Sequence, residues 1–245
     1  MQAITVLQKC LSAVFSQMHA SRRDVLLGAV TTLLLGRRLI LMDLARAWPG
    51  AKRVRAPLKR LDRLRSNRHL ANEAEPLYAA MARWLIRSTR PVIVIDWSDL
   101  KVDGSLHLLR AAIPVGGRTL TVLEAIYPEC EKNSPHVERA FLQRLKVLLP
   151  GGVKPILVTD AGFRTPWFRR VRKLGWDYLG RVRHRTRVPL ATGGEWIANR
   201  TLHRQARTRP TRFHAVRIVH NAPWPCDLVL VRKRRCGRQS LTHRG

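Results

Sequence analysis

Acidic residues are scarce in this sequence. The chain carries 16 Asp plus Glu against 46 Lys plus Arg, which gives a formal net charge of +30 over 245 residues. An excess of this size exceeds what solubility requires and indicates a polyanionic partner. Basic residues are spread along the chain from Arg22 to Arg244 and are not confined to one tail, so we expect a cationic surface that contacts phosphate backbones at several places. The alternative is a solvated basic surface without a ligand.

Cysteine is also rare, and the four cysteines form no Cys-x-x-Cys pair. Their spacing argues against a disulfide framework and is typical of cytosolic thiols. The longest apolar run, residues 25–35, is too short to span a bilayer and lies between arginine pairs, so it predicts a buried helix. No basic segment followed by a cleavage site opens the chain, and we expect a cytoplasmic protein with no membrane partner.

The hydrophobic pattern changes twice along the chain. Residues 1–90 have helical spacing with almost no strand signals and predict three or four helices. Residues 91–183 alternate short strands with helices, and residues 184–245 are irregular and strand-prone. With 45% hydrophobic residues, the chain can bury a sizeable core.

The segment 55–70 predicts a basic amphipathic helix, with an apolar stripe formed by its leucines at positions 58, 61 and 64. The polar side chains off this stripe are Lys59, Arg60, Arg63 and Asn67. Such a helix can contact DNA phosphates or base edges, or it can be a surface helix with a charged face. The global charge favours DNA contact, and Arg68 and Arg164 are further candidate contacts.

An apolar strand runs from Pro91 into Asp96. A short Val and Ile run is typical of a strand buried on both faces, where an ionised carboxylate requires a paired charge or a metal. Residues 106–115 and 118–127 flank a Gly-Gly turn and predict a hairpin. Residues 135–149 predict a helix that ends at a Pro-Gly-Gly segment.

A second apolar strand runs from residue 154 into Asp160 and is followed by a helix over 165–175 and a strand over 176–183. In a ribonuclease H-like sheet with this order, the first and fourth strands are parallel neighbours, which brings Asp96 and Asp160 to one edge. Two carboxylates so close repel each other unless a cation lies between them, and carboxylate oxygens suit Mg²⁺. The alternatives are a helix N-cap for Asp160 and an ion pair with an arginine for Asp96.

The motifs "VIVIDWSDL", "LRAAIPVGGRTLTVLEAIYP", "PILVTDAGFRTPWF" and "LGWDYLGRVR", with "LKRLDRLRSNRHL" upstream, resemble the DDE transposases of bacterial insertion sequences, in the IS-four family. The resemblance implies an α/β fold: a ribonuclease H-like mixed sheet flanked by helices over 91–183, an N-terminal helical DNA-binding region over 1–90, and a β-rich insertion over 184–245. It makes Asp96 and Asp160 the first two acids of a catalytic triad that binds Mg²⁺, with Mn²⁺ as a substitute, for two-metal phosphoryl transfer. It also implies binding to terminal inverted repeats of double-stranded DNA, a homodimer in a synaptic complex, and association with the nucleoid.

The third acid of that family is a glutamate in a Tyr-x2-Arg-x3-Glu-x6-Lys signature. Tyr178 and Arg181 have the first spacing, but Arg185 occupies the position of the glutamate. The acids that follow Asp160 are Asp177, Glu195 and Asp227. Glu195 lies in the expected insertion without the rest of the signature. We therefore expect a truncated or frameshifted product, and a non-catalytic DNA-binding protein is the alternative to an active transposase. A different nuclease on the same fold would leave the upstream basic helix unexplained.

Overall fold

The computed structural model describes residues 3–182, 186–189, 195–219 and 223–232. Arg185, the residue at the position of the signature glutamate, and the tail from residue 233 lie outside these ranges. The chain forms two compact units, one made of residues 1–159 and 166–179 and the other of residues 160–165 and 180–245. No helix among the described residues is long and apolar enough to cross a membrane.

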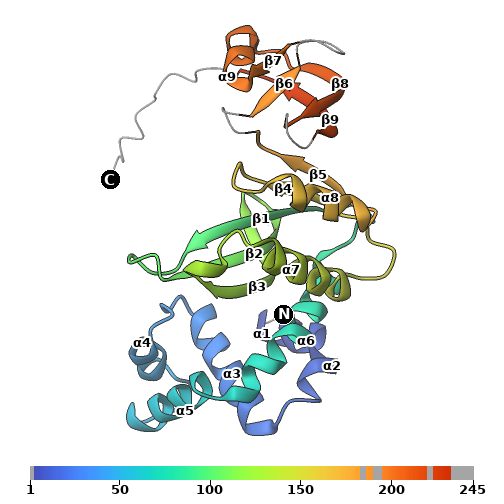
Figure 1. Ribbon diagram of the computed structural model, residues 1–245. Helices are drawn as coiled ribbons and strands as arrows, with labels where there is room; N and C mark the ends of the chain where they lie inside the picture. The colour runs from blue at the N-terminus through green and yellow to red at the C-terminus, as the bar shows by residue number, and fades with distance from the viewer. Residues whose placement is uncertain (1–2, 183–185, 190–194, 220–222, 233–245) are drawn as a thin grey trace. The chain divides into compact units, whose positions relative to one another are not determined.

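Residues 3–90 form helices around two small cores, and there are more of these helices than the three or four predicted (Figure 1). These helices are α1 (Ala3–Cys10), α2 (Ser12–Phe15), α3 (Ala20–Leu34), α4 (Leu41–Arg46), α5 (Arg55–Arg65) and α6 (Arg68–Leu85). One core lies among α1, α2, α3 and α6 and is centred on Phe15 and Ala80. The other joins α3, α4 and α5 and is centred on Leu44 and Leu61.

Two helix predictions in this region need correction. The segment 55–70 is not one helix, because α5 ends at Arg65 and Asn67 caps α6 by accepting a hydrogen bond from the His69 backbone N–H at 2.9 Å. An asparagine in extended backbone satisfies a free N–H group of a new helix better than it continues an old one. The apolar run 25–35 lies mostly in α3 but is only partly buried, since Leu34 and Leu35 are more than half exposed.

A five-stranded mixed sheet follows, with the strand order β3-β2-β1-β4-β5. The strands are β1 (Val92–Asp99), β2 (Leu106–Val115), β3 (Arg118–Pro128), β4 (Ile156–Thr159) and β5 (Asp177–Gly180). The β2–β3 hairpin turns at Gly116 and Gly117, both at positive φ, as the Gly-Gly signal predicted. The parallel pairing of β1 with β4 is also confirmed. This arrangement is compatible with a ribonuclease H-like fold.

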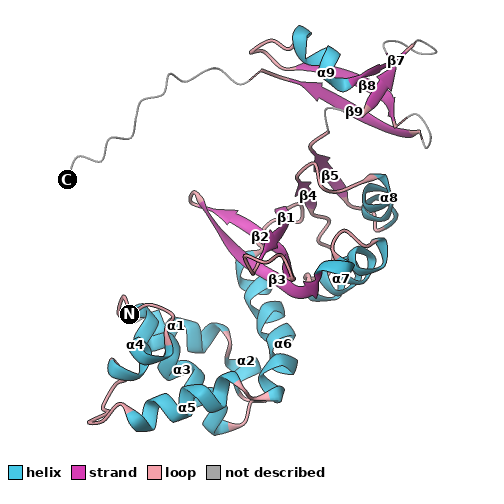
Figure 2. Cartoon of the chain, turned by 60° about the vertical axis from the view of Figure 1, so that its left-hand side comes forward, coloured by secondary structure: helices cyan, strands magenta, loops and turns pink. Residues whose placement is uncertain are grey.

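Helices α7 (Pro135–Leu148) and α8 (Thr165–Lys173) lie on the same face of the sheet in Figure 2, and both were predicted. A short 3₁₀ turn, η1 (Glu129–Glu131), precedes α7. The two helices contribute Phe141, Leu145, Trp167 and Val171, which are fully buried, as are Ile93, Ile95, Leu109 and Leu157 of the sheet. Since alternate residues of a strand point to opposite faces, the other face of β1 carries Val92, Val94 and Asp96.

The second unit has a separate small core and contains β6 (Arg187–Pro189), β7 (Trp196–Ala198), α9 (Asn199–Leu202), η2 (His203–Gln205), β8 (Thr211–Ile218) and β9 (Trp224–Leu230). Antiparallel pairs join β6 to β7 and β8 to β9. Val188, Leu202 and Leu228 are buried in the core, with Trp224 packed against it. The strand-rich character expected for this part of the chain is therefore present.

Candidate functional site

Asp96 lies inside β1 and not at its end, because the strand continues to Asp99. Its side chain is exposed, which corrects the expectation of a carboxylate buried on both sides. The Ser98 hydroxyl donates a hydrogen bond to Asp96 Oδ2 at 3.0 Å. No ion pair joins Asp96 to an arginine among the described residues, although Arg110 is its cross-strand neighbour in β2. Among the described residues, the Ser98 hydroxyl is therefore the group that hydrogen-bonds this exposed carboxylate.

Asp160 directly follows β4 and is exposed. Its Oδ1 accepts a hydrogen bond from the Gly162 backbone N–H at 2.8 Å, which closes a local turn. It is not the N-cap of α8, since that helix begins at Thr165. A Cβ atom at Gly162 would lie 2.9 Å from Asp160 Oδ1, so a larger residue there would shift the Asp160 carboxylate.

The parallel register of β1 and β4 ends one residue before each aspartate. Ile95 of β1 is the parallel partner of Thr159 of β4, and the next residue in each segment is Asp96 or Asp160. Each carboxylate also keeps one oxygen that accepts no hydrogen bond from the described residues, Oδ1 in Asp96 and Oδ2 in Asp160. Among those same residues, no group of three or more His, Cys, Asp or Glu side chains is arranged to hold a metal ion.

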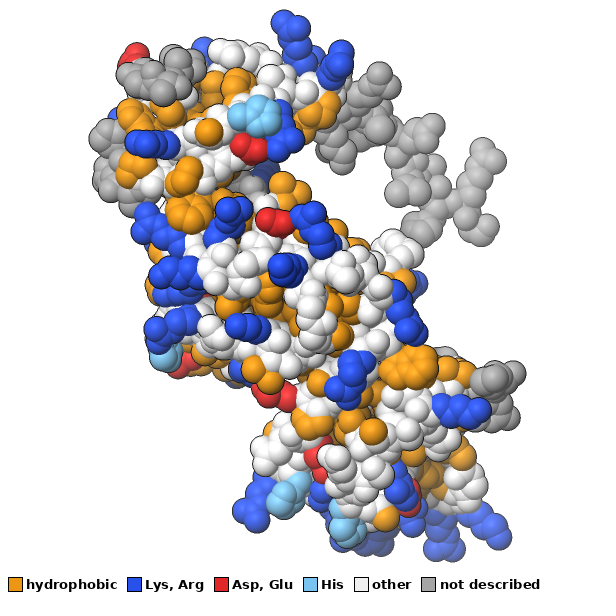
Figure 3. All heavy atoms as spheres, turned by 90° about the vertical axis from the view of Figure 1, so that its right-hand side faces the viewer, with side chains coloured by type: hydrophobic (Ala, Val, Ile, Leu, Met, Phe, Trp, Pro, Cys, Tyr) orange, Lys and Arg blue, Asp and Glu red, His pale blue; other side chains and the backbone are white. Residues whose placement is uncertain are grey.

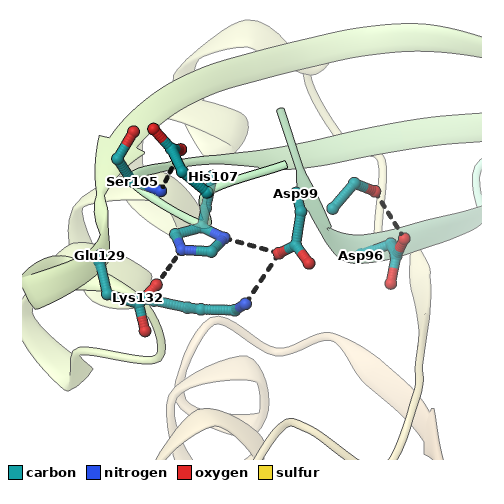
Figure 4. Close-up of polar contacts among 8 residues, drawn as sticks. Asp96, Asp99, Ser105, His107, Glu129 and Lys132 are labelled. Atoms are coloured by element: carbon teal, nitrogen blue, oxygen red, sulfur yellow. Dashed lines mark hydrogen bonds and ion pairs between the residues drawn. The ribbon is translucent and has the colours of Figure 1, made fainter. Parts of the chain in front are cut away.

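A second polar cluster lies on the other face of β1 (Figure 4). His107 of β2 is only 1% exposed, and its Nδ1 lies 2.8 Å from Asp99 Oδ1 while its Nε2 contacts Glu129. Lys132 donates to the same Asp99 oxygen at 2.9 Å. Since carboxylates only accept, both imidazole nitrogens donate when the ring is protonated. Hydrogen bonds from Lys132, and next from His107, hold the pKa of Asp99 below its ordinary value.

This cluster ties the end of β1 to the start of β2 and to the turn η1. Asp99 and Asp96 are three residues apart on one strand, so their side chains point to opposite faces. Trp97 packs edge-on against Tyr127 on the face of the cluster, with ring centroids 5.6 Å apart. The cluster therefore fixes the strand that carries Asp96 without adding a ligand beside it.

The cations predicted on α5 are exposed, whereas Leu61 on its opposite side is 3% exposed. Arg60, Arg63 and Asn67 line a cavity of about 820 Å³ with residues of α1 and α3, Arg22 among them. The indole of Trp48 also lines it and lies against Gly28, where a Cβ atom would come within 2.3 Å. Arg68 and Arg164 are exposed as well. The apolar stripe and charged face of α5 are thus confirmed, while DNA contact stays a prediction.

Lys and Arg side chains are spread over the face of the molecule shown in Figure 3, with few acidic side chains among them.

The acidic residues that follow Asp160 in the sequence differ in their contacts. Asp177 pairs with Arg90 at 2.5 Å, and Asp227 pairs with Arg212 at 2.6 Å, which lowers the pKa of Asp227. Glu195 is exposed next to β7.

Sequence reasoning missed three charged residues near the aspartate motifs. His107 and Arg110 interrupt an apolar strand, and Glu124 interrupts the next one. An isolated charged residue in an otherwise apolar strand indicates that the residue has a polar partner, but the sequence pattern does not identify that partner. Arg110 Nε donates to Glu124 Oε2 at 3.1 Å, so these two charges neutralise each other across the hairpin.

Comparison with known families identifies a match over residues 87–224, more than half of the chain, to the family described as Transposase DDE domain. The match covers the five-stranded sheet and both aspartate motifs, and it extends into the second unit. Comparisons with curated proteins and with solved structures found no match.

Proposed function

Because the chain belongs to the transposase DDE domain family, we propose that it binds DNA and that Asp96 and Asp160 are metal ligands of its phosphoryl-transfer site. One observation carries the proposal. Parallel pairing aligns Ile95 of β1 with Thr159 of β4, and the next residue after each of them is an exposed aspartate. The two alternative roles are not observed, since Asp160 does not cap α8 and Asp96 forms no ion pair among the described residues.

The donor set suits one hard cation. Mg²⁺ prefers carboxylate oxygens and keeps several of its own water molecules, so two monodentate aspartates are sufficient to hold it. The unbonded oxygens of Asp96 and Asp160 are available for this purpose, while Ser98 and the Gly162 N–H orient the carboxylates. A divalent cation bound there would offset the charge of the phosphate and activate water or a 3′-hydroxyl.

We assign recognition of DNA ends to the N-terminal helices. The support is the exposed basic side of α5, whose Arg60 and Arg63 line the same cavity as Arg22. Phosphate contacts from such a surface fix the position of the duplex, and base contacts add specificity. In this proposal the substrate is the terminal inverted repeat of the element that encodes the chain, and two copies act together in a synaptic complex.

A second candidate function is DNA binding without cleavage. Positioning two metal ions requires a further carboxylate, and the acids after Asp160 do not supply one in the family's signature. Asp177 and Asp227 are each committed to an arginine. The 245-residue chain is therefore expected to bind DNA and one Mg²⁺ or Mn²⁺ without cutting the duplex.

An end-cleavage assay combined with metal titration tests both candidates. The parent, Asp96→Asn and Asp160→Asn are compared with Asp103→Asn, which removes an exposed carboxylate from the loop between β1 and β2. We expect Mn²⁺ binding in the parent and control, at least tenfold weaker binding in the other two, and cleavage by none of them. Unchanged Mn²⁺ affinity in Asp96→Asn and Asp160→Asn would refute the metal assignment.

Cleavage by the parent that is lost in Asp96→Ala would instead establish an active enzyme and remove the second candidate. Loss of cleavage in Glu195→Ala as well would identify Glu195 as the third ligand.

A further inference from the structure

A row of alternating charges crosses the face of the sheet that carries Asp96. Asp96 of β1 is the register partner of Arg110 in β2, and Arg110 is the register partner of Glu124 in β3. Directly paired residues of antiparallel strands point to the same face. The Arg110 side chain therefore stands between two carboxylates, one of which belongs to the candidate metal site.

Arg110 is bound to the carboxylate on its far side. Its Nε donates to Glu124 Oε2 at 3.1 Å, while Asp96 is hydrogen-bonded only by Ser98 among the described residues. Glu124 also forms a hydrogen bond with the hydroxyl of Tyr78 in α6. Burial of the phenol is the main cause that raises the pKa of Tyr78 to about 12, and this hydrogen bond is the second. The phenol thus stays a donor at neutral pH, and Glu124 is held from two elements.

This arrangement leaves the outer part of the guanidinium available. The terminal nitrogens of Arg110 have no partner among the described residues, and 43% of its side chain is exposed. A guanidinium whose Nε–H alone donates to a carboxylate has four further N–H donors on its two terminal nitrogens. Their planar geometry matches two oxygens of a phosphate. If Arg110 served only to neutralise Asp96, the guanidinium would be expected to contact that carboxylate instead.

We propose that Arg110 binds a phosphate of the DNA strand that lies at Asp96, and that Glu124 and Tyr78 are positioning residues that hold its guanidinium for this contact. The inference rests on the proposed function, because it requires DNA at this face of the sheet. It adds a binding residue to the first unit that lies within the same sheet as Asp96.

The test measures binding of a fluorescein-labelled terminal-repeat duplex by anisotropy at 50 to 200 mM salt. Arg110→Ala should weaken binding about tenfold, as expected for one charged hydrogen-bonding partner, and lower the salt slope by about 0.9. Arg110→Lys should keep the slope and lose affinity, since it keeps the charge without the fork. Glu124→Gln should also keep the slope and lose affinity, because Arg110 keeps its charge while the hydrogen bond that holds its guanidinium weakens. Arg118→Ala, at the tip of the same hairpin, is the control for loss of one exposed cation.

A duplex series with single neutral methylphosphonates locates the contact. One position should weaken binding of the parent about tenfold and leave binding of Arg110→Ala unchanged. A steep parent slope with no effect of Arg110→Ala would overturn this inference alone, as would an equal effect of Arg118→Ala. A parent that binds no duplex would overturn the proposed function and this inference with it. If Arg110→Ala melts at a lower temperature, Arg110→Gln removes the charge with a smaller change of volume and should be equally insensitive to the methylphosphonate.

Discussion

Replacing Lys59, Arg60 and Arg63 together by alanine gives the sharpest test of how this protein holds DNA. All three side chains are exposed on α5, and none has an ion-pair partner among the described residues. The apolar side of α5 is packed separately through Leu61, which is 3% exposed. Alanine is the best helix former, so the triple variant should keep its stability within about 1 kcal/mol.

The expected loss follows from counterion release. Each phosphate contact contributes about 0.9 to the slope of log K against log salt, so three contacts contribute about 2.7. Over a fourfold rise in salt, from 50 to 200 mM, three contacts make the parent lose about 40-fold more affinity than the triple variant. Fluorescence anisotropy on one duplex at five salt concentrations measures both slopes directly.

A control must distinguish the loss of contacts made by α5 from the effect of lowering the net charge of the chain by three. The triple variant Arg118→Ala, Arg139→Ala and Lys146→Ala removes three exposed cations from the hairpin and α7 and changes the net charge equally. Its slope should stay close to that of the parent. An equal flattening in both triple variants would mean that binding comes from distributed charge, and an unchanged slope in the α5 variant would show that this helix does not touch the backbone.

Three further predictions concern packing, pH and the turn after β4. Leu61→Ala should lower the free energy of unfolding by about 2–5 kcal/mol in urea titrations, because it leaves a cavity among α3, α4 and α5. The pKa of Asp99 is lowered in the fold, so its contribution is present above the ordinary carboxyl pKa of about 4 and is lost as pH falls through the folded-state value. Asp99→Asn should accordingly be less stable than the parent at pH 7, and a difference that does not shrink below pH 4 would contradict the assignment. Gly162→Ala should weaken Mn²⁺ binding several-fold in calorimetry, since the new Cβ displaces the Asp160 carboxylate, and unchanged affinity would remove Asp160 from the ligand set.

The sheet could be predicted because its signals are local. The apolar runs that lead to Asp96 and Asp160 form β1 and β4, and the Gly116-Gly117 turn requires positive φ that glycine tolerates. The order of strands and helices then left few topologies, and the parallel pairing of β1 with β4 followed from it.

The break between α5 and α6 was missed because the apolar pattern contains no stop signal. Leu58, Leu61 and Leu64 have helical spacing, and no glycine or proline follows them before residue 70, so the pattern alone favours a single helix. The helix break is instead marked by Asn67. Its side chain accepts the hydrogen bond of the His69 N–H, which a backbone carbonyl would accept in a continuous helix. The apolar run also indicated a strand covered on both faces, whereas only one face of β1 is buried: Val92 and Asp96 on the other face are exposed.

The cluster around His107 depends on pairing that the sequence does not state. Asp99 is the register partner of His107, and Glu129 and Lys132 follow β3 from the adjacent position of the hairpin. These residues are separated by up to 33 positions in the chain. Periodicity identifies which face a residue occupies, but it does not identify the residue opposite.

The register of the β2–β3 hairpin determines which carboxylate the Arg110 guanidinium contacts. The turn pairs Val115 with Arg118 and Ala112 with Thr121, and continuing this count would place Arg110 opposite Leu123. The register shifts between Ala111 and Ala112, where one extra residue of β3 is accommodated, and Arg110 comes to lie opposite Glu124. Without that bulge the guanidinium would lack its carboxylate anchor and would face Asp96 as its nearest acidic partner. A one-residue irregularity thus directs the arginine toward Glu124 and leaves the Asp96 carboxylate available to a cation.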